Sequence, residues 1–291
     1  MFGRVITAMA TPFDREGALD LERARSLAEY LVANGSDGLV LAGSTGESPT
    51  LSFEEKRDLF GAVTEAVGAR ADVVAGTGTY NTAESIHLST MAAEQGVDGL
   101  LVVTPYYSRP PQSGLLAHFR AVAAATDLPV ILYDIPSRTA RKIEHETLLK
   151  LAEVPNIVGV KDAAGDLAGT ARLVAEKPDD FTIWSGDDAL TLAMLALGAH
   201  GVISVASHLV GPRLQALVEA HTKGDGDLAA GINRELVPLF DVLFITSNPI
   251  PLKAALEMVG RPAGGPRLPL VPATEAEKTK VRAVLEQLGL V

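Results

Sequence analysis

One of the nine lysines in the sequence differs from the others in its surroundings. Lys161 ends the apolar run IVGVK at residues 157–161. The other eight lie in helical or polar-turn segments that suit solvated positions: Lys56, Lys142, Lys150, Lys177, Lys223, Lys253, Lys278 and Lys280. Because successive side chains of a β-strand point to opposite faces, Lys161 shares a face with Ile157 and lies opposite Val158 and Val160. If the two valines pack against helices, Lys161 points into the centre of the fold.

A lysine shielded from water in such a place can carry out imine chemistry. Burial disfavours the charged ammonium form, and the neutral amine attacks carbonyl carbons. The alternative is that Lys161 reaches water from the strand end or pairs with Asp162. The spacing of the residues alone favours neither the imine-forming lysine nor this structural alternative.

Four of the five tyrosines follow predicted strands, and only Tyr30 lies in a predicted helix. The four are Tyr80, Tyr106, Tyr107 and Tyr133. A buried tyrosine usually packs with its hydroxyl group hydrogen-bonded, but a phenol can also relay protons in catalysis. Together these residues predict a tyrosine-rich mouth of the fold.

Two further segments carry groups suited to binding a carboxylate. Ser44 and Thr45 lie in the glycine-flanked turn GSTGE at residues 43–47, whose backbone N–H groups can hold an anion. Arg138 lies beyond the predicted strand that ends at Tyr133, and its guanidinium matches a carboxylate in shape and charge. The alternatives are a helix cap for the turn and a surface salt bridge for Arg138.

No metal site is predicted. The six histidines are scattered without metal-binding spacing. The adjacent pair Asp187 and Asp188 follows a predicted strand, but neighbouring aspartates more often cap a helix than bind a metal.

One pattern recurs eight times along the chain: a short aliphatic run, a polar or glycine-rich turn and a helical segment. The predicted strands are residues 3–12, 38–43, 71–76, 99–104, 128–133, 157–161, 181–185 and 201–205. Eight parallel strands with helical crossovers favour a (β/α)8 TIM barrel in the α/β class, with a doubly wound open sheet as the alternative. The open sheet is less favoured because Gly76 and Gly78 lack the third glycine of the dinucleotide-binding pattern. In a barrel, catalytic groups lie at the C-terminal ends of the strands.

Further helical segments follow the eighth predicted strand, near residues 227–245, 251–259 and 274–288. They exceed what the eighth helix of a barrel requires. The sequence therefore predicts a barrel in residues 1–224 and a C-terminal helical extension in residues 225–291.

The composition limits the possible partners and compartment. The formal net charge is −11, so nucleic acid is not an expected partner. The chain has no cysteine, which excludes disulfides and thiolate chemistry and fits a reducing compartment. The first eleven residues lack the features of a signal peptide, and no apolar run is long enough to span a membrane. We expect a cytoplasmic protein without a membrane partner.

Five segments together resemble the dihydrodipicolinate synthase / N-acetylneuraminate lyase family. They are GSTGE (43–47), YDIPSR (133–138), GVKD (159–162), SGDD (185–188) and NPIPLK (248–253). The resemblance covers nearly the whole chain, and the combination is far more specific than any one segment. Within the family, Arg138, the NPIP stretch and the segment VVTPYY at residues 102–107 are similar to the synthases that condense pyruvate with aspartate semialdehyde in diaminopimelate and lysine biosynthesis.

The resemblance implies a set of catalytic roles without a separate cofactor. Lys161 would form a covalent imine with pyruvate. Tyr133 would act as general acid and base while the resulting enamine attacks the aldehyde, and Ser44 and Tyr107 would complete its proton relay. In the family Tyr107 reaches a neighbouring subunit's site, and two dimers usually form a homotetramer.

The resemblance also implies how the substrates are held. Thr45 would bind the pyruvate carboxylate, and Gly186 and Ile203 would line the pocket through their backbones. Arg138 would bind the carboxylate of the semialdehyde. Ser44 is a departure, since the synthases usually have threonine there and the sugar-acid lyases often have serine, but a hydroxyl group is retained.

A lysine feedback site of the family would correspond to Ser48, Lys56, Tyr80, Glu84 and Tyr106. Ser48, Glu84 and Tyr106 fit the pattern of that site. Lys56 and Tyr80 stand where lysine-sensitive members tend to have histidine and asparagine. Because a cation at Lys56 would repel the ammonium of an incoming lysine, we expect feedback inhibition to be weak or absent.

Two other functions remain as alternatives. One is a pyruvate-dependent class I aldolase acting on N-acetylneuraminate or a 2-keto-3-deoxy sugar acid, although Arg138 and Tyr107 suit a short anionic aldehyde better than a polyol. The other is a non-catalytic barrel that serves as a binding module. The joint presence of Lys161, Tyr133, Ser44 and Thr45 argues against it.

Overall fold

Eight parallel strands form a closed barrel in which each strand pairs with its neighbours in chain order. The structure, a computed structural model, describes residues 2–291. The strands are β1 (Val5–Ala8), β2 (Gly38–Leu41), β3 (Asp72–Gly76), β4 (Gly99–Val103), β5 (Val130–Asp134), β6 (Ile157–Asp162), β7 (Thr182–Ser185) and β8 (Gly201–Ser204). The predicted TIM barrel is confirmed, and each strand lies within or overlaps its predicted range.

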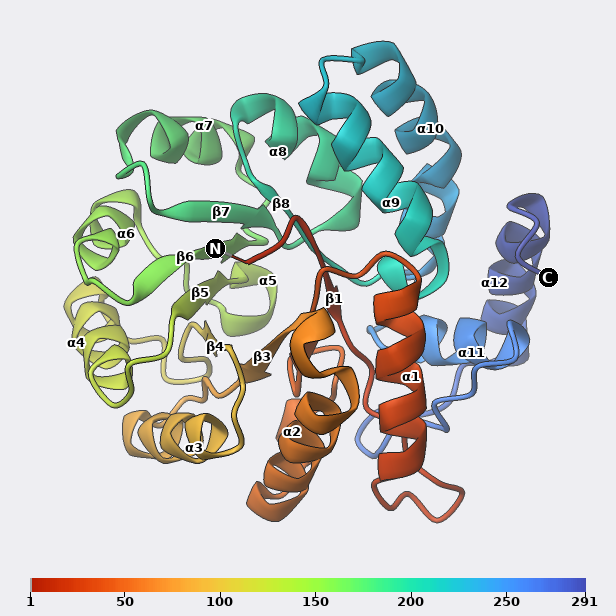
Figure 1. Cartoon of the computed structure of the whole chain (residues 1–291), viewed down its shortest axis with the longest axis horizontal. Helices are drawn as coiled ribbons and strands as arrows, with labels where there is room; N and C mark the ends of the chain where they lie inside the picture. The colour runs from red at the N-terminus through yellow and green to blue at the C-terminus, as the bar shows by residue number, and fades with distance from the viewer. Residues whose placement is uncertain (1) are drawn as a thin grey trace.

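Helices cover the outside of the barrel (Figure 1). They are α1 (Leu21–Ala33), α2 (Phe53–Val67), α3 (Thr82–Glu94), α4 (Gln112–Ala123), α6 (His145–Ala152), α7 (Leu167–Glu176), α8 (Thr191–Leu197) and α9 (Ser207–Thr222). The short helix α5 (Pro136–Thr139) follows β5 and lies inside this ring of helices (Figure 1). Several helix starts are encoded locally. The side chains of Asp20, Ser52 and Asn81 accept hydrogen bonds from backbone N–H groups in the first turns of α1, α2 and α3.

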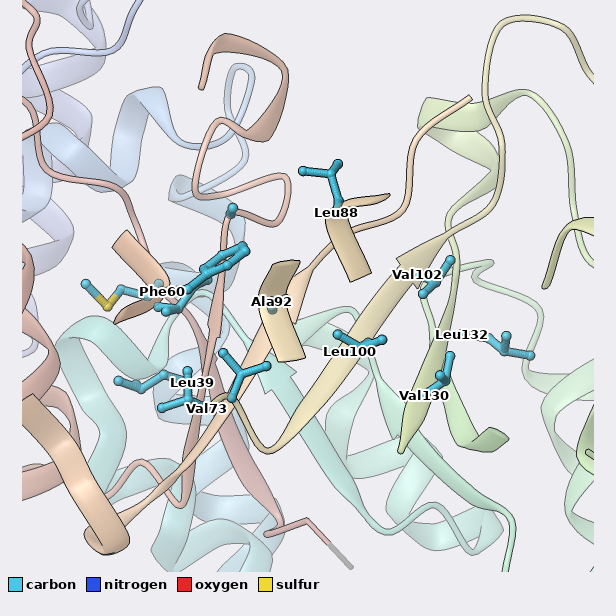
Figure 2. Packing of buried hydrophobic residues seen from close by; sticks show 14 of the residues in the cluster. Leu39, Phe60, Val73, Leu88, Ala92, Leu100, Val102, Val130 and Leu132 are labelled. Carbon is cyan, nitrogen blue, oxygen red and sulfur yellow. The ribbon is translucent and has the colours of Figure 1, made fainter. Parts of the chain in front are cut away.

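Alternation along the strands divides the apolar core into two parts. In β4, Leu100 and Val102 pack against the surrounding helices, whereas Leu101 faces the barrel interior. Figure 2 shows part of the outer cluster, where Leu100 lies near Val73 of β3 and Ala92 of α3. The inner cluster instead fills the space enclosed by the strands. The candidate site lies next to this cluster, at the C-terminal ends of the strands.

The pairing of β5 with β6 contains a register shift between Val130 and Ile131. As a result, Ile157 packs in the outer cluster and Val158 against the inner one. The sequence predicts the reverse for both residues, and that prediction is wrong. A bulge adds one residue to one strand, so the alternation cannot be extended through it.

Three helices follow the barrel: α10 (Gly226–Val242), α11 (Ile250–Met258) and α12 (Glu275–Gln287). The helical extension is thus present, and α11 and α12 lie at one side of the barrel (Figure 1). One apolar cluster joins it to the barrel, since Val5 of β1 and Val202 of β8 pack in the same cluster as Leu239 of α10 and Leu285 of α12. We propose residue 224 as the boundary between the two parts, which share this core.

A buried ion pair also connects the extension to the barrel. Nζ of Lys253 in α11 lies 2.6 Å from Oε1 of Glu47, and the two side chains are 2% and 0% exposed. Lys253 also donates to the carbonyl of Gly265 and lies over the Phe13 ring. Burial lowers the pKa of Lys253, and the Glu47 carboxylate opposes that shift.

The predicted solvated positions of Lys56 and Lys253 are therefore wrong, because both residues are buried. Lys253 lies in a helix whose neighbouring residues are also buried, and its charge is matched by Glu47. Lys56 is on the inner side of α2, where Glu84 is its nearby opposite charge.

We expect Lys253→Met to destabilise the fold, because the substitution leaves the Glu47 carboxylate buried without its cation. Removing one partner of a buried pair typically costs about 3–5 kcal/mol. The free energy of unfolding, measured by urea denaturation, checks this expectation. Adding Glu47→Gln should recover part of the loss. Lys223→Met is a matched control, since Lys223 makes an equally short but exposed pair with Glu219. Equal effects of the two lysine substitutions would contradict the assigned importance of the buried pair.

Candidate active site

A cavity of about 310 Å³ opens at the C-terminal ends of the strands. Its walls come mainly from the ends of β2 to β5, from the loops that follow them and from the C-terminal extension. The lining residues are Ala42, Gly43, Ser44, Glu47, Ser48, Pro49, Thr50, Gly76, Gly78, Leu101, Val103, Tyr106, Tyr133, Ile135, Arg138, Thr139, Asn248, Pro269 and Leu270. The predicted residues Ser44, Tyr133, Arg138, Ser48 and Tyr106 are therefore brought together around one space.

Lys161 is buried at the edge of this cavity. It lies directly opposite Tyr133 in the β5–β6 register, and Nζ is 4.4 Å from the centre of the Tyr133 ring. The carboxylate of Asp162 instead accepts hydrogen bonds from the Thr170 hydroxyl and the Ala164 N–H, at 2.7 and 2.9 Å. The alternatives of a water-exposed lysine and a Lys161–Asp162 pair are thus not observed. Lys161 does not itself line the cavity, but it contacts the tyrosine that does.

Of the two predicted backbone positions, Gly186 lies against the lysine, whereas Ile203 lies in the inner cluster on another strand. Gly186 follows β7, and a Cβ atom there would lie 3.1 Å from Cε of Lys161 and 2.8 Å from Cβ of Ala163. A larger residue at this position would therefore press on the lysine. Ile203 of β8 is fully buried in the inner cluster, where it pairs with Ile6 of β1.

The turn after β2 holds Ser44 and Thr45 in different surroundings. Ser44 lines the cavity, whereas Thr45 is 3% exposed and its Oγ1 accepts a 2.9 Å hydrogen bond from Nδ2 of Asn248. Glu47 closes the turn by donating its N–H to the Ser44 carbonyl, and its own backbone has a positive φ of 54°. The buried Glu47 carboxylate fixes this turn through its contact with Lys253.

Tyr107 lies apart from the other catalytic candidates. Its side chain is 94% exposed and does not line the cavity, and its φ is +68°. Tyr80 is also exposed and packs edge-on against Tyr106. Among the described tyrosines only Tyr106 and Tyr133 line the cavity, so the prediction that all four tyrosines gather at the mouth is wrong for Tyr80 and Tyr107. Position after a strand end does not determine the side-chain direction, which the loop conformation sets.

Arg138 lies in the short helix α5 at the rim of the cavity. Its Nη2 donates a long 3.4 Å hydrogen bond to the backbone carbonyl of Asn248. Within residues 2–291 the guanidinium makes no salt bridge, which removes the surface-pair alternative for that part of the chain. Its donors are available to an anionic ligand.

The residues of the predicted feedback site form a second group beside the cavity. Burial lowers the pKa of Lys56, and Glu84 opposes this shift. Burial raises the pKa of Tyr106, with further contributions from Tyr80 and Glu84. Ser48 and Tyr106 both line the cavity. The two sites are therefore contiguous in space.

Three residues of the site carried no predicted role: Glu47, Asn248 and Lys253. Glu47 and Asn248 line the cavity, and Lys253 holds Glu47 in place. A usable signal was present in the sequence, because Lys253 interrupts an otherwise apolar helical run from Ile250 to Leu256. A charged residue on such a run indicates a buried partner.

The described part of the chain contains no group of three or more His, Asp or Glu side chains arranged to bind a metal ion. Among residues 2–291, no helix has the length and apolar character needed to cross a membrane.

Comparisons with known proteins agree with this geometry. The 4-hydroxy-tetrahydrodipicolinate synthase of Moorella thermoacetica is 57% identical over 289 residues, with 99% of each chain covered. The crystal structure of DHDPS from Cyanidioschyzon merolae with lysine bound is 46% identical, with a TM-score of 0.98 and coverage of 100% and 99%. The chloride-inhibited dihydrodipicolinate synthase from Acinetobacter baumannii complexed with pyruvate is 36% identical, with a TM-score of 0.97 and full coverage of both chains. The profile of the Dihydrodipicolinate synthetase family matches residues 1–288, and the chain belongs to this family.

Proposed function

We propose that the chain condenses pyruvate with L-aspartate 4-semialdehyde to 4-hydroxy-tetrahydrodipicolinate, in diaminopimelate and lysine biosynthesis. The observation that carries the proposal is the buried Lys161 against the Tyr133 ring at the mouth of the barrel. The name of the Moorella thermoacetica relative, which matches over nearly its whole length, supports this choice of reaction.

In the proposed reaction the neutral amine of Lys161 attacks the ketone carbon of pyruvate, and loss of water gives an imine. Loss of a methyl proton converts the imine to an enamine, whose carbon attacks the aldehyde. The amino group of the second substrate then displaces the lysine and closes the ring. No separate cofactor takes part in these steps, since the imine itself is the electron sink.

Tyr133 is the proposed general acid and base of these proton transfers. It lies directly against Lys161 and lines the cavity. Ser44 lines the same cavity. Within the described residues of one chain no hydrogen bond joins Ser44, Tyr133 and Tyr107, and the proposed relay takes its Tyr107 from a second subunit.

A homotetramer built as a dimer of dimers is part of the proposal. The support is Tyr107, whose ring is almost fully exposed in the single chain. An exposed aromatic side chain on a loop beside the cavity is suited to insertion into a partner's site. The proposal also includes a cytoplasmic location, which the absence of cysteine supports.

Substrate binding is assigned to four residues. Thr45 would bind the pyruvate carboxylate, with Gly186 and Ile203 beside it, and Arg138 would bind the carboxylate of the semialdehyde. The position of Arg138 at the rim, without a competing carboxylate, supports its role.

Turnover of pyruvate with aspartate semialdehyde, coupled to a reductase that oxidises a nicotinamide cofactor, tests the proposed function. Pyruvate with N-acetylmannosamine serves as the comparison. We expect turnover of pyruvate with the semialdehyde and no turnover of pyruvate with N-acetylmannosamine. Activity only with the sugar would overturn the choice of substrate while retaining the imine chemistry.

Incubation with pyruvate and borohydride should add one pyruvate-derived group per chain by mass, because the reductant traps the imine. Lys161→Ala should abolish the adduct. Lys150→Ala, at an exposed lysine of α6, is the control and should leave it unchanged. An adduct that persists in Lys161→Ala would show that another lysine forms the imine.

Tyr133→Phe should retain the fold and lose about 10²- to 10⁴-fold in kcat, the usual contribution of a general acid or base. The ring remains to pack against Lys161, so only the hydroxyl group is tested. Steady-state kinetics and the thermal unfolding midpoint check both parts. An unchanged kcat would remove Tyr133 from the mechanism.

Free L-lysine should inhibit turnover weakly or not at all. Lys56 is buried near Glu84, and a cation at this position would repel the ammonium of an incoming lysine. Initial rates over a range of lysine concentrations check this expectation. A tight, saturating inhibition curve would contradict it.

A further inference from the structure

Asn248 contacts both groups that are assigned to bind substrate carboxylates. It lies between α10 and α11, is 5% exposed and lines the cavity. Its Nδ2 donates to Oγ1 of Thr45 at 2.9 Å, and its backbone carbonyl accepts from Nη2 of Arg138 at 3.4 Å. A single residue of the C-terminal extension thus joins two parts of the site that are distant in sequence.

The direction of the first hydrogen bond has a chemical consequence. An amide nitrogen can only donate, so the Thr45 oxygen is the acceptor and the hydroxyl proton is not used in this bond. That proton remains available for donation to another group. A hydroxyl held in this way is a donor prepared for a carboxylate.

We infer that Asn248 is a positioning residue for pyruvate, holding the Thr45 hydroxyl so that it donates to the pyruvate carboxylate. The inference rests on the proposed function. Asn248 acts through Thr45, and its effect on Arg138 passes through a backbone carbonyl that every residue type retains.

The surroundings of Asn248 fix its position relative to the turn that carries Thr45. Lys253, in the helix that follows Asn248, forms the buried pair with Glu47 of the same turn. The backbone N–H of Arg267 donates to the other carboxylate oxygen of Glu47 at 2.8 Å. The turn is therefore tied to the extension at both Thr45 and Glu47, which leaves the Asn248–Thr45 distance little freedom to vary.

Three substitutions test the inference: Asn248→Ala, Asn248→Asp and Thr45→Val. The readouts are the pyruvate concentration for half-maximal borohydride trapping and the KM for each substrate. Asn248→Ala should raise the pyruvate concentration needed for half-maximal trapping about 3- to 10-fold, the range for loss of one neutral hydrogen bond. Thr45→Val should raise the same concentration about 10- to 100-fold, since the proposed hydrogen bond from Thr45 goes to the charged carboxylate of pyruvate. The KM for the semialdehyde in Asn248→Ala should change less than about 2-fold, because the backbone acceptor of Arg138 is kept.

Asn248→Asp distinguishes positioning from packing. Aspartate has nearly the size of asparagine, so a purely structural role predicts a milder defect than that of alanine. A carboxylate can only accept, however, and would capture the Thr45 proton and repel the pyruvate carboxylate. We therefore expect weaker pyruvate binding in Asn248→Asp than in Asn248→Ala. In a Thr45→Val background, Asn248→Ala should have no further effect on pyruvate.

Three outcomes would overturn the inference: a milder defect in Asn248→Asp than in Asn248→Ala, equal increases in both KM values, or additive effects of Asn248→Ala and Thr45→Val. Thermal unfolding of each variant identifies any that fail to fold. If Asn248→Ala does, the near-isosteric Asn248→Asp carries the test through the KM values for the two substrates, since equal increases in both would overturn the inference. Failure of the proposed function looks different, because the unmodified protein would then form no pyruvate adduct.

Discussion

The register between β5 and β6 determines whether Lys161 faces the interior of the barrel or the surrounding helices. Tyr133 lies opposite Lys161 in this register, and both side chains are on the inner face of the barrel. A slip by one residue would turn Lys161 toward the aliphatic residues under the helices. The register shift at Val130 keeps Ile157 in the outer core while Lys161 faces inward, so one strand serves both the packing of the helices and the site.

The C-terminal extension completes the site that the barrel begins. Its own apolar cluster continues into the outer faces of β1 and β8, so it is held as part of the same core. From that position it supplies Asn248 to the turn after β2 and the cation that neutralises Glu47. Burying a charge is costly unless its partner is fixed, and the packing of α11 provides that fixed partner.

Local sequence patterns were sufficient for the barrel because each βα unit carries its own signals. The aliphatic runs, the cap residues Asp20, Ser52 and Asn81, and the glycine-rich turns all act within a few residues of one another. The position of Lys161 at the end of an apolar strand was recognisable for the same reason. The substrates assigned to this lysine came from resemblance to a family and not from the spacing of the residues.

By itself, the sequence determined the order of the strands and helices, the position of Lys161 at the end of an apolar strand and the gathering of Ser44, Tyr133 and Arg138 at one end of the barrel. Only the tertiary structure decided that Lys253 is buried beside Glu47 and that Asn248 donates to Thr45. The physical reason is sequence separation. Periodicity and capping act over neighbouring residues, whereas these contacts join residues about 200 positions apart and form only when the extension packs against the closed barrel.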